Sequence, residues 1–123
     1  MIGIGTDLVD IDRFREVLRR TPGMRARLFC AAELAYADQS ADPARPLAAR
    51  FAAKEATLKS LKSGLGAMRF TEIEVVRFED GHPELVLHGD AATFAAAKGA
   101  HRFEMTLSHT DTLAQAVVVA LAS

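Results

Sequence analysis

LAARFAAKEATLKSLK, at residues 47–62, is the strongest helical segment of the chain. It is rich in alanine, leucine, lysine and glutamate, which favour the α-helix intrinsically. The sequence SGLG at 63–66 ends the helical pattern, because closely spaced glycines favour a turn. Before the helix, residues 40–46 contain two prolines and predict a loop, while residues 31–38 predict a shorter helix.

The chain before this region predicts a strand followed by a helix. Residues 1–5 have the pattern of a short strand. Residues 10–20 predict a helix, because apolar side chains recur from Ile11 at positions i, i+3 and i+7. The sequence Thr-Pro-Gly at 21–23 ends this helix, since proline lacks a donor and glycine accepts a left-handed cap.

Four more strand patterns follow the long helix, at residues 70–79, 84–88, 103–109 and 113–121. The first two flank the turn sequence Asp-Gly-His-Pro and predict a hairpin. Between the second and third, Asp90 can cap a helix that Gly99 closes. This order of elements predicts an α+β fold rather than a doubly wound sheet. We expect one domain over residues 1–123.

The composition argues against several classes of protein. Half of the residues are hydrophobic, and 15 basic and 16 acidic side chains give a formal net charge of −1. Nonspecific nucleic-acid binding normally requires a basic excess. Cys30 is the single cysteine, so no internal disulfide or thiolate zinc site is expected. The longest apolar run, residues 116–122, is the length of a strand, so we expect no signal peptide or membrane span and a cytoplasmic protein.

Asp7 follows the first predicted strand, in the sequence GIGTD at residues 3–7. A carboxylate at this position can bind a metal ion. The alternative is a turn or a helix cap, as we expect for Asp10 and Asp12 close to the start of the first helix. Spacing alone favours the capping role for Asp7.

Glu55 projects beside the apolar stripe of the long helix. A carboxylate close to a packed face must be paired, neutralised or bound to a cation. The alternative is an ordinary surface pair with Lys59 at i, i+4. Without further context, the helical spacing favours that pair.

His109 ends a predicted strand beside Thr110 and Asp111. A histidine next to a hydroxyl and a carboxylate can hold a phosphate or accept a proton. The alternative is a hairpin in which the threonine and aspartate only stabilise the turn, and this is the commoner situation.

Other signals favour an oxygen-ligated cation over zinc or a nucleotide loop. The histidines have no ligand-like spacing, which argues against zinc. Gly3-x-Gly5 lacks the third glycine of a dinucleotide fingerprint. Carboxylates such as Asp7 and Glu55 suit Mg²⁺. Basic residues of the long helix, including Arg50, form a solvated face or, near a bound metal, a polyphosphate cradle.

Four segments together resemble the holo-acyl-carrier-protein synthase family: GIGTDLVDIDR (3–13), ARFAAKEATLK (49–59), DGHPEL (80–85) and TLSHT (106–110). They occur in order over essentially the whole chain. The resemblance implies the small α+β 4′-phosphopantetheinyl transferase fold, with a mainly antiparallel sheet packed on a long helix. It also implies a reaction in which coenzyme A donates 4′-phosphopantetheine to a serine of apo acyl carrier protein and adenosine 3′,5′-bisphosphate is released.

The family resemblance also implies a set of site residues. Magnesium would be held by Asp7 and Glu55, and Lys54 would contact phosphate as part of the catalytic machinery. The serine proton would pass to Glu55, a metal-bound water, His109 or Asp111. The residues implied to bind coenzyme A are Asp7, Arg50, Lys54, Glu55, Lys59, Lys62, Ser63, Gly64, Pro83, His109 and Thr110.

The resemblance implies partners as well. Family sites lie between the subunits of a homotrimer, so the His109 turn would meet the two carboxylates across an interface. Acyl carrier proteins of this kind are acidic, and Arg13 and Arg20 of the first helix are candidate docking residues. Those arginines can equally form a solubilising surface. Two other functions remain open: a binding module without transfer activity, and a magnesium-dependent hydrolase of nucleotide diphosphates. No nucleic acid or membrane partner is expected.

Overall fold

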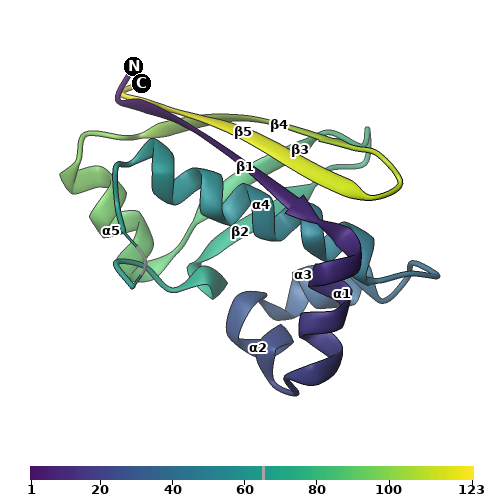
Figure 1. Ribbon diagram of the computed structural model, residues 1–123. Coiled ribbons are helices and arrows are strands. Elements are labelled where there is room, and N and C mark those ends of the chain that lie inside the picture. The colour runs from purple at the N-terminus through teal and green to yellow at the C-terminus, as the bar shows by residue number, and fades with distance from the viewer. Residues whose placement is uncertain (65) are drawn as a thin grey trace.

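A three-stranded antiparallel sheet lies against one long helix in the computed structural model, which describes residues 1–64 and 66–123 (Figure 1). The helix is α4, Ala44–Ser60. The strands of the sheet, in spatial order, are β1 (Gly3–Asp10), β5 (Leu113–Leu121) and β4 (Arg102–His109). Both pairings in this sheet are antiparallel.

A second, two-stranded sheet is formed by β2 (Ile73–Arg77) and β3 (Pro83–Leu87), which confirms the predicted hairpin. The other helical elements are α1 (Ile11–Arg20), α2 (Met24–Leu28), α3 (Ala31–Ala37), the 3₁₀ turn η1 (Phe70–Glu72) and α5 (Gly89–Ala97). The antiparallel sheets and separate helices confirm the α+β class. Within the described part of the chain, no helix is long and apolar enough to cross a membrane.

Two glycines allow α4 to pack directly on β1. A Cβ atom at Gly3 would lie 2.0 Å from the carbonyl oxygen of Ser60, and one at Gly5 would lie 2.0 Å from that of Ala56. Any side chain at either position would therefore push the helix away from the strand. The Gly-x-Gly sequence is thus explained by close packing of backbone against backbone.

The two faces of the three-stranded sheet differ sharply in exposure. On the face covered by α4, alternate residues of β5 are fully buried, among them Ala116 and Val118. On the opposite face, Ile4 is 59% exposed and Leu8 is 60% exposed. Because side chains alternate along a strand, the second face presents an apolar surface to solvent.

The structure corrects the predicted boundaries of several elements. The strand predicted over residues 70–79 is confined to Ile73–Arg77, because residues 70–72 form the 3₁₀ turn η1. β1 continues to Asp10 instead of ending at Gly5, because all eight of its residues pair with β5. α4 begins at Ala44, so the loop predicted over 40–46 is wrong at its end. Pro46 fits there because the first turn of a helix needs no donor from its backbone nitrogens.

The start of α5 was also predicted wrongly, and α2 was not predicted. Asp90 lies in the first turn of α5, and the residue at the N-cap is His88. The carboxylate of Glu72 instead accepts a hydrogen bond from the backbone nitrogen of Ala91 at 3.2 Å. A side chain from η1 therefore caps a helix that lies 19 residues further along the chain. Helix α2 has only five residues, too few to show a helical period.

Candidate active site

Asp7 and Glu55 line the same cleft, although they come from distant parts of the sequence. Asp7 lies on the side of β1 that faces α4, two residues after Gly5, and Glu55 projects from α4. The cleft has a volume of about 420 Å³. Its lining residues are Asp7, Leu8, Val9, Asp10, Arg13, Phe14, Val17, Phe51, Glu55 and Lys59; we call it the carboxylate cleft.

The charges in the carboxylate cleft are incompletely balanced. Burial raises the pKa of Glu55, and the nearby charge of Asp7 raises it further, while Lys59 acts in the opposite direction. The ammonium group of Lys59 donates to Asp7 Oδ1 at 3.0 Å and to the carbonyl oxygen of Thr6 at 2.9 Å. Lys59 is therefore bonded to Asp7 and acts on Glu55 only through its charge, which leaves Glu55 able to bind a further cation.

This geometry decides between the alternatives for both acidic residues. Lys59 bonds to Asp7, so the ordinary Glu55–Lys59 surface pair is not the arrangement observed. The capping role at the start of α1 belongs to Asp10, whose Oδ1 accepts from the backbone nitrogen of Arg13 at 3.0 Å. Asp7 is left facing the cleft.

The donor set of the cleft fits a magnesium ion. Mg²⁺ is commonly held by one or two carboxylates, with phosphate oxygens and waters in its other positions. In the described ranges, no group of three or more histidine, cysteine or acidic side chains is placed to hold a metal. A cation between Asp7 and Glu55 would thus keep most of its coordination positions open for a substrate.

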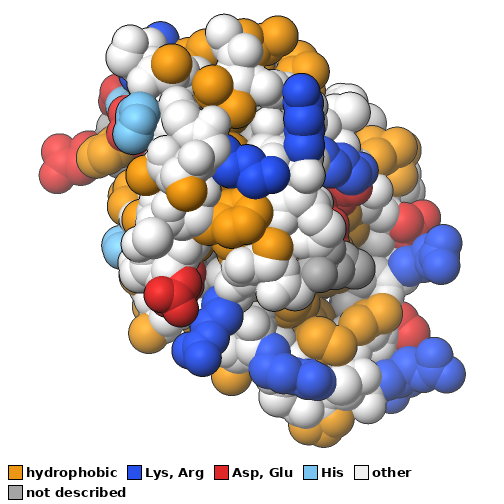
Figure 2. Space-filling view, turned by 90° about the vertical axis from the view of Figure 1, so that its left-hand side faces the viewer, with side chains coloured by type: hydrophobic (Ala, Val, Ile, Leu, Met, Phe, Trp, Pro, Cys, Tyr) orange, Lys and Arg blue, Asp and Glu red, His pale blue; other side chains and the backbone are white. Residues whose placement is uncertain are grey.

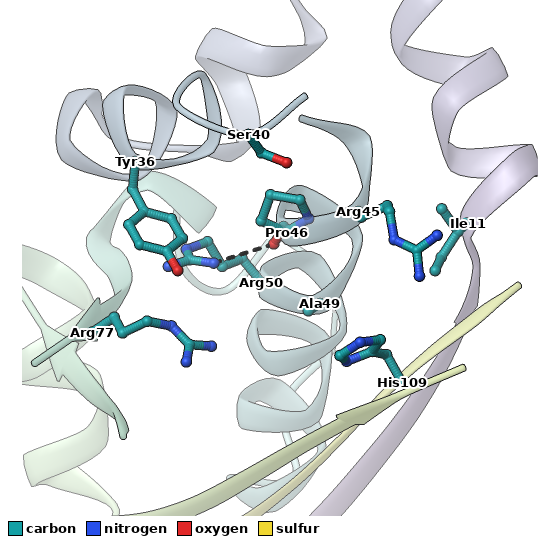
Figure 3. Close-up of a pocket in the computed structure, with 9 residues that line it drawn as sticks. All are labelled: Ile11, Tyr36, Ser40, Arg45, Pro46, Ala49, Arg50, Arg77 and His109. Carbon is teal, nitrogen blue, oxygen red and sulfur yellow. Dashed lines mark hydrogen bonds between the residues drawn. The ribbon is translucent and has the colours of Figure 1, made fainter. Parts of the chain in front are cut away.

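A second, smaller cavity contains two of the basic groups predicted to bind the substrate, Arg50 and His109. It has a volume of about 230 Å³. Figure 3 shows Tyr36 and Arg77 on one side and Arg45 and His109 on the other, with Arg50 projecting from α4 between them. We call it the arginine cavity.

Arg50 is held in the wall of the arginine cavity with part of its hydrogen-bonding capacity unused. The residue is 2% exposed, and its guanidinium carbon lies 4.3 Å from the centre of the Tyr36 ring. Its Nη1 donates to the carbonyl oxygen of Pro46 at 3.3 Å, whereas Nε has no partner among the residues described. Burial lowers the pKa of Arg50. A bound anion would satisfy this group and offset the cost of its burial.

The carboxylate cleft and the arginine cavity lie at opposite edges of the sheet. His109 on β4 is level with Ala114 on β5, which in turn is level with Val9 on β1. Two inter-strand spacings amount to roughly 10 Å. A single chain therefore does not bring His109 to Asp7 and Glu55.

Lys54 is placed in the protein interior, away from both sites. Its ammonium group donates to Glu33 Oε1 and to the carbonyl oxygen of Phe70, both at 2.7 Å. The side chains of Lys54 and Glu33 are each 0% exposed. Burial lowers the pKa of Lys54, although the charge of Glu33 opposes that effect. The predicted contact between Lys54 and phosphate does not fit this geometry.

The turn after His109 is stabilised by Thr110, as the structural alternative for this turn predicted. Thr110 Oγ1 accepts hydrogen bonds from the backbone nitrogens of Thr112 and Leu113, at 3.2 and 3.0 Å. The side chain of Asp111 is fully exposed and lies 3.8 Å from Arg45 Nη2. Asp111 is therefore positioned at the mouth of the arginine cavity and not in the carboxylate cleft.

The remaining predicted contacts lie outside the two sites. Lys62, Ser63 and Gly64 follow the end of α4 and are not among the described residues that line either one. Lys62 adopts a positive φ of 56°, which turns the chain away from the helix axis. Pro83 begins β3 and pairs with Arg77, so it adjoins the arginine cavity without lining it.

The two candidate docking arginines differ in their surroundings. Arg13 lines the carboxylate cleft, whereas Arg20 lies 3.7 Å from Glu16 on the exposed side of α1. Figure 2 shows lysine and arginine side chains protruding from the lower part of the molecule, where α1 and α2 lie, with fewer acidic ones among them. Of the two candidate docking arginines, only Arg13 lies at the cleft.

Sequence reasoning missed three residues of the arginine cavity: Tyr36, Arg45 and Arg77. They come from α3, the first turn of α4 and the end of β2. Tyr36 is the single tyrosine of the chain, and both Arg50 and Arg77 lie over its ring. None of the three follows a motif or a spacing that points to a shared site.

A model of the 4′-phosphopantetheinyl transferase superfamily matches residues 3–120. The chain therefore belongs to this superfamily. A holo-[acyl-carrier-protein] synthase of Clavibacter michiganensis is 47% identical over 117 residues, which are 95% of this chain and 92% of the relative. Another from Moorella thermoacetica is 39% identical over 119 residues, covering 97% of this chain and 93% of the relative.

Solved structures agree with the sequence relatives. The crystal structure of the holo-[acyl-carrier-protein] synthase of Neisseria meningitidis has a TM-score of 0.90 and 30% identity, with 98% of both chains covered. A Bacillus anthracis synthase in complex with CoA (3′,5′-ADP) has a TM-score of 0.83 and 28% identity, and the match covers 99% of this chain and 97% of that one. Within the superfamily, this chain groups with the holo-[acyl-carrier-protein] synthases, as its motifs predicted.

Proposed function

We propose that this chain transfers 4′-phosphopantetheine from coenzyme A to a serine of an apo acyl carrier protein and releases adenosine 3′,5′-bisphosphate. The observation that carries the proposal is the convergence of Asp7 and Glu55 on one cleft. That convergence occurs in a chain 47% identical to a holo-[acyl-carrier-protein] synthase. Related synthases have been solved with coenzyme A, which supports coenzyme A as the donor here.

The residues of the carboxylate cleft suit a reaction at a diphosphate. Asp7 and Glu55 would hold Mg²⁺, which when bound supplies charge neutralisation and polarises the phosphorus. Lys59 orients Asp7 through their hydrogen bond and adds a positive charge for the leaving phosphate. Of the three side chains considered as proton acceptors, only Glu55 lines this cleft.

The arginine cavity suits the nucleotide end of coenzyme A. Arg50 has an unused donor there, and His109 lies at the same cavity. Guanidinium groups bind phosphate oxygens through charge-assisted hydrogen bonds. We therefore assign the adenosine bisphosphate to this cavity, with Thr110 at its edge.

We further propose a homotrimer in which the arginine cavity of one subunit adjoins the carboxylate cleft of the next. Two features support this arrangement. The residues for one substrate lie at opposite edges of the sheet, and the sheet face that carries Ile4 and Leu8 is apolar and exposed. Exposed apolar surfaces of this kind commonly mark subunit interfaces. Mass measurement in solution, for the chain and for Ile4→Glu, tests the trimer; a monomer for the unmodified chain would contradict it.

Intact-mass analysis tests the transfer itself. Apo acyl carrier protein incubated with coenzyme A, magnesium and the chain should gain one phosphopantetheine. The Asp7→Asn and Glu55→Gln variants should lose most of this activity. Cleavage of coenzyme A without carrier protein would instead indicate a hydrolase, and coenzyme A binding without any product would indicate a binding module. Either result would refute the transferase.

A further inference from the structure

The arginine cavity carries more positive charge than its surroundings neutralise. Three guanidinium groups, those of Arg45, Arg50 and Arg77, line it together with His109 (Figure 3). The charge of Glu33 reaches Arg50, but Glu33 is already bound to the ammonium group of a buried lysine. Two further acidic groups act on Arg45: Asp42, whose carboxylate is already bonded to Arg15, and Asp111.

The contacts that hold Arg45 are weak. Arg45 Nη2 donates to the carbonyl oxygen of Thr110 at 3.4 Å and lies 3.8 Å from Asp111 Oδ1. Both distances exceed those of a strong charge-assisted hydrogen bond. The Asp111 side chain is fully exposed, so water screens the pair. A phosphate entering the cavity offers Arg45 a doubly charged acceptor in place of these contacts.

We infer that Asp111 is a built-in counter-ion that competes with the substrate's phosphate for Arg45, and that Arg45 is an additional phosphate-binding residue of the arginine cavity. The inference rests on the proposed function, because it takes a nucleoside bisphosphate as the ligand. It assigns Asp111 a role opposite to proton acceptance: the residue weakens binding of the nucleotide end. Arg45 then exchanges between Asp111 in the free protein and phosphate in the complex.

Calorimetric titration of adenosine 3′,5′-bisphosphate into the full chain, with magnesium present, tests this exchange. Asp111→Asn keeps the shape and removes the charge, and it should tighten binding about two- to fivefold, as expected for an exposed ion pair. Arg45→Gln should weaken binding about tenfold. In the double variant, Asp111→Asn should no longer increase affinity, because its effect passes through Arg45. Arg45→Lys should restore part of the affinity.

The controls separate this exchange from a general change in charge. Asp80→Asn removes another exposed acid, which is bound to His82 in the hairpin turn, and should leave affinity unchanged. The gain from Asp111→Asn should shrink as salt increases. The same gain in the Arg45→Gln background, or no gain at all, would overturn the inference.

Transfer kinetics distinguish a counter-ion from a proton acceptor. Loss of a counter-ion lowers the KM for coenzyme A, whereas loss of a proton acceptor lowers kcat. A tenfold fall in kcat for Asp111→Asn, without tighter binding, would refute the inference and leave the transferase proposal intact. Bisphosphate binding with the expected variant pattern, but with no mass gain on the carrier protein, would refute the transferase alone.

Discussion

Replacement of Lys54 by methionine tests whether its buried ammonium group stabilises the fold. In the structure, this group bonds to Glu33 and to the Phe70 carbonyl oxygen, both at 2.7 Å and away from solvent. Glu33 also accepts hydrogen bonds from the backbone nitrogens of Cys30 at 3.0 Å and Val75 at 2.9 Å. The ion pair thus connects α3, α4, η1 and β2.

The expected cost follows from leaving Glu33 without its cation. Methionine matches lysine in length and is apolar, so little packing is lost at Lys54. An unpaired buried charge costs about 3–5 kcal/mol, out of a total unfolding free energy of about 5–15 kcal/mol for a typical domain. At about 3–5 °C per kcal/mol for a chain of this size, the melting temperature should fall by about 10–20 °C.

Thermal unfolding followed by circular dichroism measures this effect. Lys59→Met is the matched control, because Lys59 lies on the same helix with its side chain 53% exposed; it should change stability by less than about 1 kcal/mol. Lys54→Met combined with Glu33→Gln should recover part of the loss, since no charge remains buried and the amide oxygen can still accept a backbone hydrogen bond. If Lys54→Met melted within about 2 °C of the parent and yet lost transfer activity, the ammonium group would act on substrate and our assignment would be wrong.

Three further predictions concern the carboxylate cleft and the elements around it, β1, α4 and α1. Burial and the charge of Asp7 raise the pKa of Glu55 above its ordinary value of 4.5, so the metal-free parent should lose stability as the pH rises from 4.5 through the pKa of Glu55 in the folded state. Urea unfolding of Glu55→Gln should show no such dependence of stability on pH. The turnover of Glu55→Gln should fall by about 100-fold or more. Gly5→Ala places a Cβ atom 2.0 Å from an α4 carbonyl oxygen and should lower the free energy of unfolding, measured by thermal unfolding, by about 1–3 kcal/mol or more. Gly64→Ala is the control, because a Cβ atom there meets no atom within 4 Å, and it should lower the free energy of unfolding far less. Asp10→Ala removes the cap of α1 and should cost about 1 kcal/mol in urea unfolding; no change would show that the cap is dispensable.

Most elements of the fold could be predicted because their patterns are local. The long helix, the hairpin and the two last strands follow from periodicity and turn residues. The failures have non-local causes. β1 extends beyond Gly5 because β5 is long enough to pair with it, and the cap of α5 comes from Glu72, far away in sequence. Neither the β1–β5 pairing nor the Glu72 cap can be predicted from the local propensity of the residues concerned.

The candidate site could be predicted only in part. Taken alone, Asp7 and Glu55 each had an ordinary structural explanation, and the family motifs were needed to join them. The partner of Lys54 is Glu33, 21 residues earlier, and no pattern in the sequence links these two. A lysine and a glutamate adjacent in one motif therefore have different roles: Lys54 holds the interior together, and Glu55 faces the cleft.

The close packing of β1 on α4 and the chemistry of the cleft depend on each other. Gly5 brings the strand against the helix, and this contact places Asp7 near Glu55. Burial and this proximity both raise the pKa of Glu55, because the nearby charge of Asp7 disfavours the charged form of Glu55. A cation held by Asp7 and Glu55 would offset this repulsion and would supply positive charge for a diphosphate. We therefore expect the electrostatic cost of placing Asp7 near Glu55 to be offset when a cation binds in the cleft.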